Sequence, residues 1–264
     1  MKLAARIEGI GLVGPGLAGW SGARDAICGV APFVMAATAI PPPEALPATE
    51  RRRASKPVRL ALAAGLEAAA AAGRPPRDLV TVFASSTGDG DNLHAICEAL
   101  ASDDRLISPT RFHNSVHNAP AGYWGIATGS TRAADSIAAF DASFGAGLLE
   151  AFARIAAQPR QPVLLIAYDA PYPQPLHATR PLCDSFAVAL ALASPEHSDR
   201  GHVASIELTR ESPTLLDDAG LEDLRRGIPA ARSLPLLQLV ARDRHEGAVI
   251  DYLAGMAIAV ELRP

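Results

Sequence analysis

Cysteine is scarce in this chain, and its placement argues against two common kinds of site. The 264 residues include three cysteines, Cys28, Cys97 and Cys183, which lie far apart in the sequence. They show no CxxC spacing and have no nearby pair of histidines, so they predict neither a zinc site nor a disulfide framework, and we expect no metal or other cofactor. Isolated thiols are typical of the reducing cytoplasm, where we expect the protein to act.

Positive charge and long apolar runs are also lacking. The formal net charge is −4, and Arg51–Arg53 is the one strongly basic stretch. A nucleic-acid binder usually has a broader basic surface, so we exclude this class of partner. No stretch of about 20 apolar residues is present, and Arg6 and Glu8 interrupt the apolar residues near the start. We therefore expect neither a membrane span nor a secretory signal.

What the chain does have is 49% hydrophobic residues, enough for a sizeable core. Short apolar segments rich in β-branched residues alternate with longer, alanine-rich helical segments. This alternation predicts a layered α/β fold, a sheet covered by helices on both sides, in a single domain over residues 1–264. We expect strands at 5–13, 79–84, 135–140, 162–168, 186–193, 202–207 and 256–262, helices at 21–28, 58–72, 91–101, 123–128, 142–157, 215–226 and 234–242, and irregular segments at 30–56 and 108–122.

Five segments, in order along the chain, resemble the β-ketoacyl synthases. RIEGIGLVGPGLAGWSGARDAICG at 6–29 resembles the opening strand, glycine turn and first helix of that family. SSTGDG at 85–90 resembles its small-residue turn after the next core strand. Residues 114–122 and 182–193 are similar to further family segments, and SIAAFDASFGAGLLEA at 136–151 is similar to the nucleophile elbow, which is a strand, a sharp turn and a buried helix.

This resemblance covers roughly residues 5–195 and implies the thiolase-like layered α/β/α fold. The chain would hold essentially the first half of a β-ketoacyl synthase, followed by a shortened C-terminal part, and the fold of residues 196–264 is left open. Within the family, the chain is most similar to the short N-terminal-like proteins and to the chain-length factors of aryl-polyene-type pathways.

The resemblance places Asp141 where the family carries its nucleophilic cysteine. A condensing enzyme needs a thiolate to accept the acyl group, and a helix N-terminus favours that anion. A carboxylate is a poor nucleophile toward a thioester, so we expect no acyl capture by Asp141 and no catalytic residue. Three roles stay open for it: an N-cap that accepts from the N–H of Ser143 or Phe144, a carboxylate that orders a partner's group, and a carboxylate that assists decarboxylation.

Two histidines of the family are also missing from this sequence. The resemblance implies that they would assist decarboxylation and stabilise the enolate, from NxHGT and GHxxGA-like motifs, and neither motif occurs here. The sequence HEGA, which begins at His245, lacks the preceding glycine. We interpret His245 as a surface loop residue.

The densest polar cluster contains His113, Asn114, His117 and Asn118. Histidines at i and i+4 can bind a metal from one helix face, but prolines on either side argue against a continuous helix. These side chains either bond the loop backbone or, as the resemblance implies, line an acyl tunnel or a dimer interface.

Three phenylalanines and the basic stretch complete the set of candidates. Phe112, Phe140 and Phe144 are either core residues or part of the tunnel or interface. Arg51, Arg52 and Arg53 are either a solvated surface or a contact for an acidic acyl carrier protein.

The missing nucleophile and the resemblance together predict a non-nucleophilic ketosynthase-like subunit of the chain-length-factor type. It would form a heterodimer with a full-length, cysteine-bearing β-ketoacyl-ACP synthase through the strand at 135–140, and shape the acyl tunnel in fatty-acid or polyketide (aryl-polyene-like) biosynthesis. One alternative is a stand-alone acyl-thioester hydrolase or malonyl decarboxylase that uses Asp141 with a histidine of 113–117. Another is a homodimeric scaffold or binding module.

Overall fold

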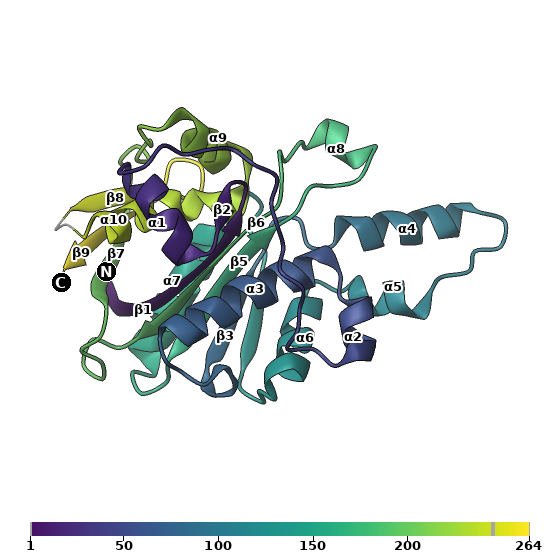
Figure 1. The fold of residues 1–264 in the computed structure, drawn as a ribbon, viewed down its shortest axis with the longest axis horizontal. Coiled ribbons are helices and arrows are strands. Elements are labelled where there is room, and N and C mark those ends of the chain that lie inside the picture. Colours follow the sequence, from purple (N-terminus) through teal and green to yellow (C-terminus); the bar gives the residue numbers. More distant parts are fainter. Residues whose placement is uncertain (1, 244–245, 264) are drawn as a thin grey trace.

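Nine strands form one mixed sheet in the part of the chain that the structure, a computed structural model, describes: residues 2–243 and 246–263. The strand order is β4-β3-β5-β6-β1-β7-β9-β8, with β2 paired to the end of β1 (Figure 1). β4, β3 and β5 are mutually parallel, and the remaining pairs are antiparallel. The bounds are β1 Leu3–Gly14, β2 Leu17–Ala18, β3 Val80–Ala84, β4 Ala134–Ile137, β5 Val163–Asp169, β6 Phe186–Ala193, β7 His202–Thr209, β8 Gly247–Asp251 and β9 Ala257–Arg263.

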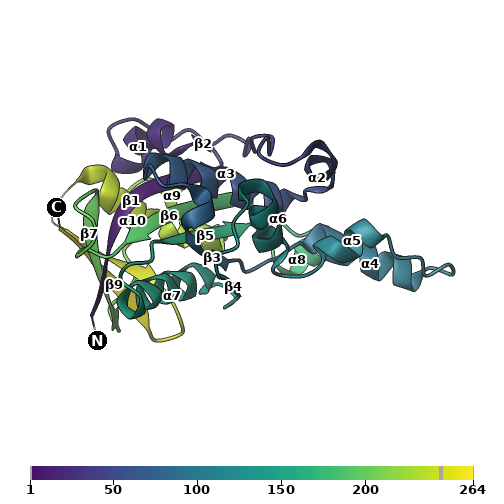
Figure 2. The same cartoon turned by 90° about the horizontal axis from the view of Figure 1, so that it is seen from below.

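Helices cover both faces of this sheet, which confirms the predicted layered α/β fold. α3 and α6 lie on one face and α7 lies on the other (Figure 2). The short 3-10 helix η2 packs against α7. The bounds are α1 Trp20–Cys28, α2 Ala48–Arg53, α3 Lys56–Ala71, η1 Pro76–Asp78, α4 Gly90–Ala101, α5 Pro109–Asn114, α6 Ala119–Thr128, α7 Ser143–Ala157, α8 Leu176–Thr179, α9 Ala219–Gly227, η2 Pro229–Ser233 and α10 Leu234–Arg242.

Small residues allow α3 to lie unusually close to β1. A side chain at Gly11 would overlap the carbonyl oxygen of Ala64, and one at Gly9 would overlap that of Ala68. The alanine-rich sequence of α3 therefore packs backbone to backbone against the strand, where larger side chains would hold the two elements apart.

The predicted elements differ from the observed ones in short segments and at element ends. α6 begins at Ala119 where 123 was predicted, α9 begins at Ala219 where 215 was predicted, and α8 and β8 were not predicted. The irregular segment 30–56 contains α2, and 108–122 contains α5, because helices of six residues are too short to show a helical period. The strand at 135–140 ends at Ile137. Residues 196–264, whose fold was left open, supply β7, β8 and β9 and so extend the same sheet. His245 lies outside the described residues, and its interpretation stays a prediction.

The α4–α5 hairpin and α8 project from the body at the same end of the molecule (Figures 1 and 2). None of the helices within the described ranges is long and apolar enough to cross a membrane.

Candidate functional site at the head of helix α7

The turn between β4 and α7 is a sharp elbow. β4 ends at Ile137 and α7 begins at Ser143. Phe140, between them, has a left-handed φ of 52°, which costs a non-glycine residue about 1 kcal/mol. The buried Ser143 hydroxyl fixes the turn, since it donates to the Phe140 carbonyl at 2.7 Å and accepts from the Ala139 N–H at 3.0 Å. This hydroxyl is therefore committed to the turn.

Asp141 lies in this elbow, and two arginines hold its carboxylate. Its Oδ1 accepts from Arg180 Nη2 at 2.7 Å, and its Oδ2 lies 3.4 Å from Arg232 Nη2. The N-cap of α7 is Ala142, with no side-chain hydrogen bond, so the N-cap role, one of the three left open for Asp141, is wrong. The physical reason is that a guanidinium forms a stronger, charge-assisted bond with a carboxylate than a neutral N–H does.

Arg180 joins the elbow to the segment around α8. Its Nη2 also donates to Ser86 Oγ at 2.6 Å, and its Cζ lies 3.6 Å from the centroid of the Phe140 ring. This cation–π contact restrains a ring that is 66% exposed. The head of α7 therefore presents an ion-paired carboxylate beside the α8 segment.

No cysteine lies at this position. Cys28 ends α1, Cys97 is exposed on α4, and Cys183 is exposed in the loop before β6. Within residues 2–243 and 246–263, no three His, Cys, Asp or Glu side chains gather as a metal site. The elbow holds an ion-paired carboxylate, and its described side chains offer no free nucleophile for a thioester.

A second carboxylate is buried behind the elbow. Asp169, at the end of β5, accepts from the N–H groups of Ser86 at 2.7 Å, Thr87 at 3.1 Å and Ala230 at 2.9 Å. Burial raises the pKa of Asp169 to about 6, while these backbone donors oppose the rise. Asp169 thereby fastens the SSTGDG turn at 85–90 and η2 to the sheet.

Two of the four polar residues predicted near a tunnel bond the backbone of other segments. Asn114 Nδ2 donates to the carbonyl of Arg53 at 2.8 Å, and His117 Nε2 lies 3.2 Å from the carbonyl oxygen of Ser85. Both contacts are of the loop-backbone kind; the first joins α5 to α2, and the second joins His117 to the end of the segment after β3. A tunnel role for these residues stays a prediction.

The other candidates differ in how much surface they expose. Phe112 is 65% exposed and lies on the projecting hairpin, whereas Phe144 is fully buried in the core behind the elbow. His113 packs edge-on against an aromatic ring of α6, and Asn118 is the residue before that helix. Four of the predicted tunnel or interface residues are thus exposed and within direct reach of a partner: Phe112, His113, Asn118 and Phe140.

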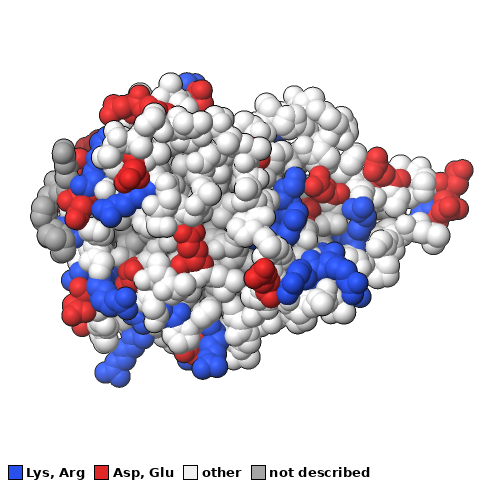
Figure 3. Space-filling model, in the orientation of Figure 1, with Lys and Arg blue, Asp and Glu red and all other residues white. Residues whose placement is uncertain are grey.

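The three arginines of α2 have different surroundings. Arg51 donates to the carbonyls of Glu44 at 2.9 Å and Leu46 at 3.1 Å, and Arg53 pairs with Glu50 at 3.5 Å. Arg52 is exposed and has no such partner among the described residues. Figure 3 shows Lys and Arg side chains gathered over α2 and the start of α3.

This gathering forms a basic cleft, a cavity of about 430 Å³ between the start of α3 and the α4–α5 hairpin. Its charged lining residues are Arg52, Arg53, Lys56, Arg59 and Arg111 against Asp89 and Asp91. The cleft is therefore a surface suited to an acidic partner.

β4 is an edge strand. In the described chain it pairs with β3 alone, and the N–H groups of Thr81 and Ser85 donate to the carbonyls of Ala133 and Ile137. Since backbone groups alternate in direction along a parallel strand, Ser136 directs its N–H and C=O away from β3. Such an open edge is a template for another strand.

Sequence reasoning does not find Arg180, Arg232 or Asp169. The sequence does contain a signal for Asp169, which is the lone carboxylate at the end of the apolar run PVLLIAYD. It contains no signal for the two arginines, because their partner Asp141 lies far from both along the chain and only the tertiary fold brings them together.

Comparisons with known proteins agree on one relationship. A family model described as the N-terminal domain of β-ketoacyl synthase matches residues 29–247. A chain in the structure of the ketosynthase ApeO in complex with its chain length factor ApeC, from Xenorhabdus doucetiae, is 23% identical, with a TM-score of 0.73 and coverage of 98% of this chain and 99% of that chain. The ishigamide ketosynthase/chain length factor gives 15% identity, a TM-score of 0.73 and the same coverage.

A third solved structure is AntDE:AntF, a type II polyketide synthase acyl-carrier protein in complex with its ketosynthase. It gives 11% identity, a TM-score of 0.70 and coverage of 99% of both chains. None of the curated protein sequences matches this chain significantly. At these identities the solved structures establish a shared fold.

Proposed function

Because this chain belongs to the β-ketoacyl synthase family, whose N-terminal domain it matches over residues 29–247, we propose that it is a non-nucleophilic subunit of the chain-length-factor type. It forms a heterodimer with a cysteine-bearing β-ketoacyl-ACP synthase in the cytoplasm and shapes the tunnel for the growing acyl chain. Acyl and malonyl groups reach the complex on acyl carrier protein, in fatty-acid or polyketide biosynthesis of the aryl-polyene type. Similar solved structures that contain a ketosynthase with its chain length factor support this kind of partner.

One observation carries the proposal: the head of α7 holds a carboxylate tied to Arg180 and Arg232, where a condensing enzyme needs a free thiolate. With both oxygens of Asp141 paired and the Ser143 hydroxyl bonded within the turn, the chain has no means to accept an acyl group at this point. The reaction therefore depends on a thiol that another subunit supplies. The same pairing argues against a stand-alone hydrolase that uses Asp141.

The open edge of β4 is where we place the partner. A strand from the ketosynthase that pairs there continues the sheet across the heterodimer and satisfies the outward N–H and C=O of Ser136. Phe140, exposed beside the end of β4, then lies at the interface and contributes to the tunnel wall, and Phe112 contacts the partner from the projecting hairpin.

The experiment is co-expression of the tagged chain with candidate cysteine-bearing ketosynthases. Purification and an elongation assay follow, in which the malonyl and acyl groups are supplied on acyl carrier protein. We expect a stable heterodimer and elongation that requires both subunits. Ser136→Pro removes the outward N–H without touching the β3 side of the ladder, so it should abolish co-purification. Ser136→Thr keeps that N–H and is the matched control.

Circular dichroism establishes that both variants fold. The proposal fails if no ketosynthase binds the chain, or if elongation is independent of it. A homodimer that forms through the same edge and excludes the ketosynthase would support the scaffold alternative instead.

A further inference from the structure

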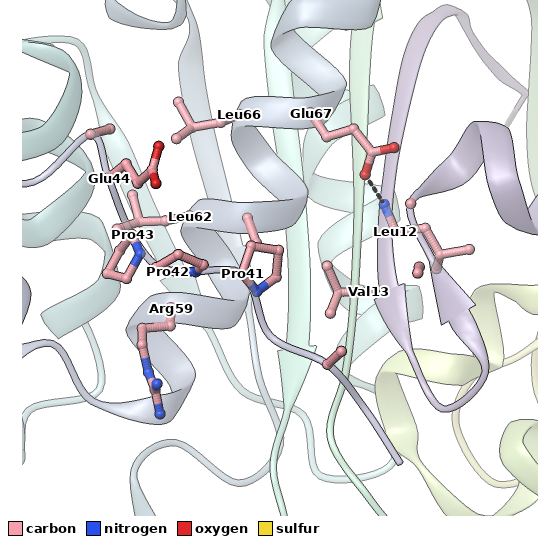
Figure 4. Close-up of a pocket in the computed structure, with 15 residues that line it drawn as sticks. Leu12, Val13, Pro41, Pro42, Pro43, Glu44, Arg59, Leu62, Leu66 and Glu67 are labelled. Carbon is pink, nitrogen blue, oxygen red and sulfur yellow. Dashed lines mark hydrogen bonds between the residues drawn. The ribbon is translucent and has the colours of Figure 1, made fainter. Parts of the chain in front are cut away.

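A cavity of about 600 Å³ lies on the outer side of α3, on the face of the sheet opposite α7. α3 forms its floor, the end of β1 closes one side, and the segment Pro41–Pro43 crosses over it (Figure 4). This volume falls in the range of about 300–1,000 Å³ that is typical of small-molecule sites. No residue of the elbow lines it, so it is a separate site.

The walls of this α3 cavity are mainly apolar. Leu12, Val13, Leu62 and Leu66 line it together with the three prolines (Figure 4). Apolar side chains and proline rings make poor partners for water, so burial of an aliphatic chain between them is favourable. The lining is thus suited to a hydrocarbon tail.

The two ends of the α3 cavity differ in charge. At one end Glu67 already uses both carboxylate oxygens, which accept from the N–H of Leu12 at 2.9 Å and of Trp20 at 2.6 Å. At the other end lies Arg59, whose guanidinium has no hydrogen-bond or ion-pair partner among the described residues (Figure 4). Glu44 also lines the cavity, but it is exposed on the crossing segment and is free to turn to solvent.

Arg59 also lines the basic cleft, so the two hollows meet at its side chain. There, five cationic side chains face two carboxylates, of which Asp89 is bonded to the start of α4. A charged group at the Arg59 end of the cavity therefore meets a positive potential. An anionic head is favoured at this end, and a cationic one is not.

We propose that the α3 cavity binds a small amphipathic anion: a linear aliphatic chain between Pro41–Pro43 and the leucines of α3, with one carboxylate or phosphate head on Arg59. Arg59 binds the head through its terminal nitrogens, in the charge-assisted geometry that guanidinium groups form with such oxygens. Because α7 lies on the opposite face of the sheet and no residue of β4 or α7 lines the cavity, binding does not require the ketosynthase partner of the proposed function.

Isothermal titration of the full-length chain with decanoate, decyl phosphate and decanol tests this inference. Decanoate or decyl phosphate should bind, and whichever binds more tightly identifies the head group. Decanol should bind at least about tenfold more weakly, because it cannot form the charge-assisted pair. Failure of both anions to bind, or equal binding of decanol, overturns the proposal.

Variants locate the ligand in the cavity. Arg59→Gln keeps helix propensity and should weaken anion binding by about tenfold or more. Leu66→Asp places a carboxylate in the tail site and should abolish binding. Arg160→Gln removes one charge from an exposed position that lines neither the cavity nor the basic cleft, and it should leave the affinity within about twofold. If Arg59→Gln binds as wild type, or Arg160→Gln is weakened equally, the anion responds to the net charge of the chain and the proposal is wrong.

Discussion

The Arg180 guanidinium and the Asp141 carboxylate lie 2.7 Å apart, nitrogen to oxygen, and this pair holds the segment after α8 against the head of α7. Arg232 approaches the second carboxylate oxygen from η2. The elbow is thus a meeting point of three segments that are distant in sequence, joined by charge where a synthase of this family is expected to carry a reactive thiol.

The two arginines beside Asp141 should lower the pKa of a cysteine introduced there by Asp141→Cys. A thiol there faces Arg180, Arg232 and the N-terminus of α7, all of which favour the thiolate. We expect its pKa to fall below the ordinary value of about 8.5. At pH 7 iodoacetamide should therefore alkylate it faster than the exposed Cys97, which serves as an internal reference in peptide mass spectrometry.

Arg180→Met in the same background should slow that alkylation toward the rate of Cys97. Equal rates for the introduced thiol with and without Arg180 would contradict the electrostatic account of the elbow. The singly substituted chain should still fail to elongate an acyl group alone, since the two family histidine motifs are absent from its sequence.

Asp169 should make stability depend on pH in a defined direction. Burial raises its pKa from 3.8 to about 6 in the folded chain. An acid with a higher pKa when folded binds its proton more tightly in that state, so its contribution is full below the unfolded pKa and is lost as the pH rises through the folded one. The free energy of unfolding should therefore lose about 2 kcal/mol from this group between pH 4 and pH 7.

Asp169→Asn removes the titration and is the reference for this measurement. Urea unfolding of both chains across that pH interval gives the difference in stability at each pH. We expect the wild-type value to fall relative to the variant as the pH rises. A difference that is flat with pH, or that grows, would show that Asp169 does not titrate in this way.

Two glycine substitutions should change the free energy of unfolding in opposite directions, because Gly11 lies where β1 meets α3 and Gly22 lies in open space. Gly11→Ala places a methyl group against the Ala64 carbonyl, which cannot move without shifting the helix, so we expect a loss of about 3 kcal/mol. In Gly22→Ala, within α1, the new methyl group meets no atom within 4 Å. This variant should raise the free energy of unfolding by about 0.5–1 kcal/mol. Thermal unfolding measures both, and comparable losses at the two sites would refute the packing argument.

Arg52 is the α2 arginine that we expect to contact an acidic carrier protein, because Arg51 and Arg53 are already bonded within the chain. Arg52→Glu should weaken carrier binding by about tenfold at low salt, and the effect should diminish as salt screens the charges. Arg160→Glu, which makes the same charge change outside the basic cleft, is the control. Equal weakening by both variants would point to net charge in place of a defined contact.

The layered fold was accessible from the sequence because its main elements are long and strongly patterned. The apolar runs of β5 and β6 and the alanine-rich α3 have one reasonable interpretation each. The shorter helices α2 and α5 were not predicted, because they have six residues each and depend on tertiary contacts such as the hydrogen bond from Asn114 to Arg53.

The candidate site was predictable in position but not in its interactions. The segment 136–151 located the elbow and Asp141, while the partners of that carboxylate come from residues 180 and 232. An N-cap is the natural local expectation for an aspartate before a helix. It failed because long-range charge pairing is invisible to a local pattern and stronger than the neutral bond it replaces.

One donor to Asp169 is the N–H of Ala230, so the hydrogen bonds of this carboxylate can be completed only late in synthesis. During synthesis the carboxylate at the end of β5 emerges some sixty residues before its final donor. Until η2 leaves the ribosome and docks, Oδ2 of that carboxylate keeps its water, while Oδ1 can already accept from the N–H groups of Ser86 and Thr87. A fragment that stops near residue 195 would therefore lack the final partner of one oxygen of Asp169 and of one oxygen of Asp141.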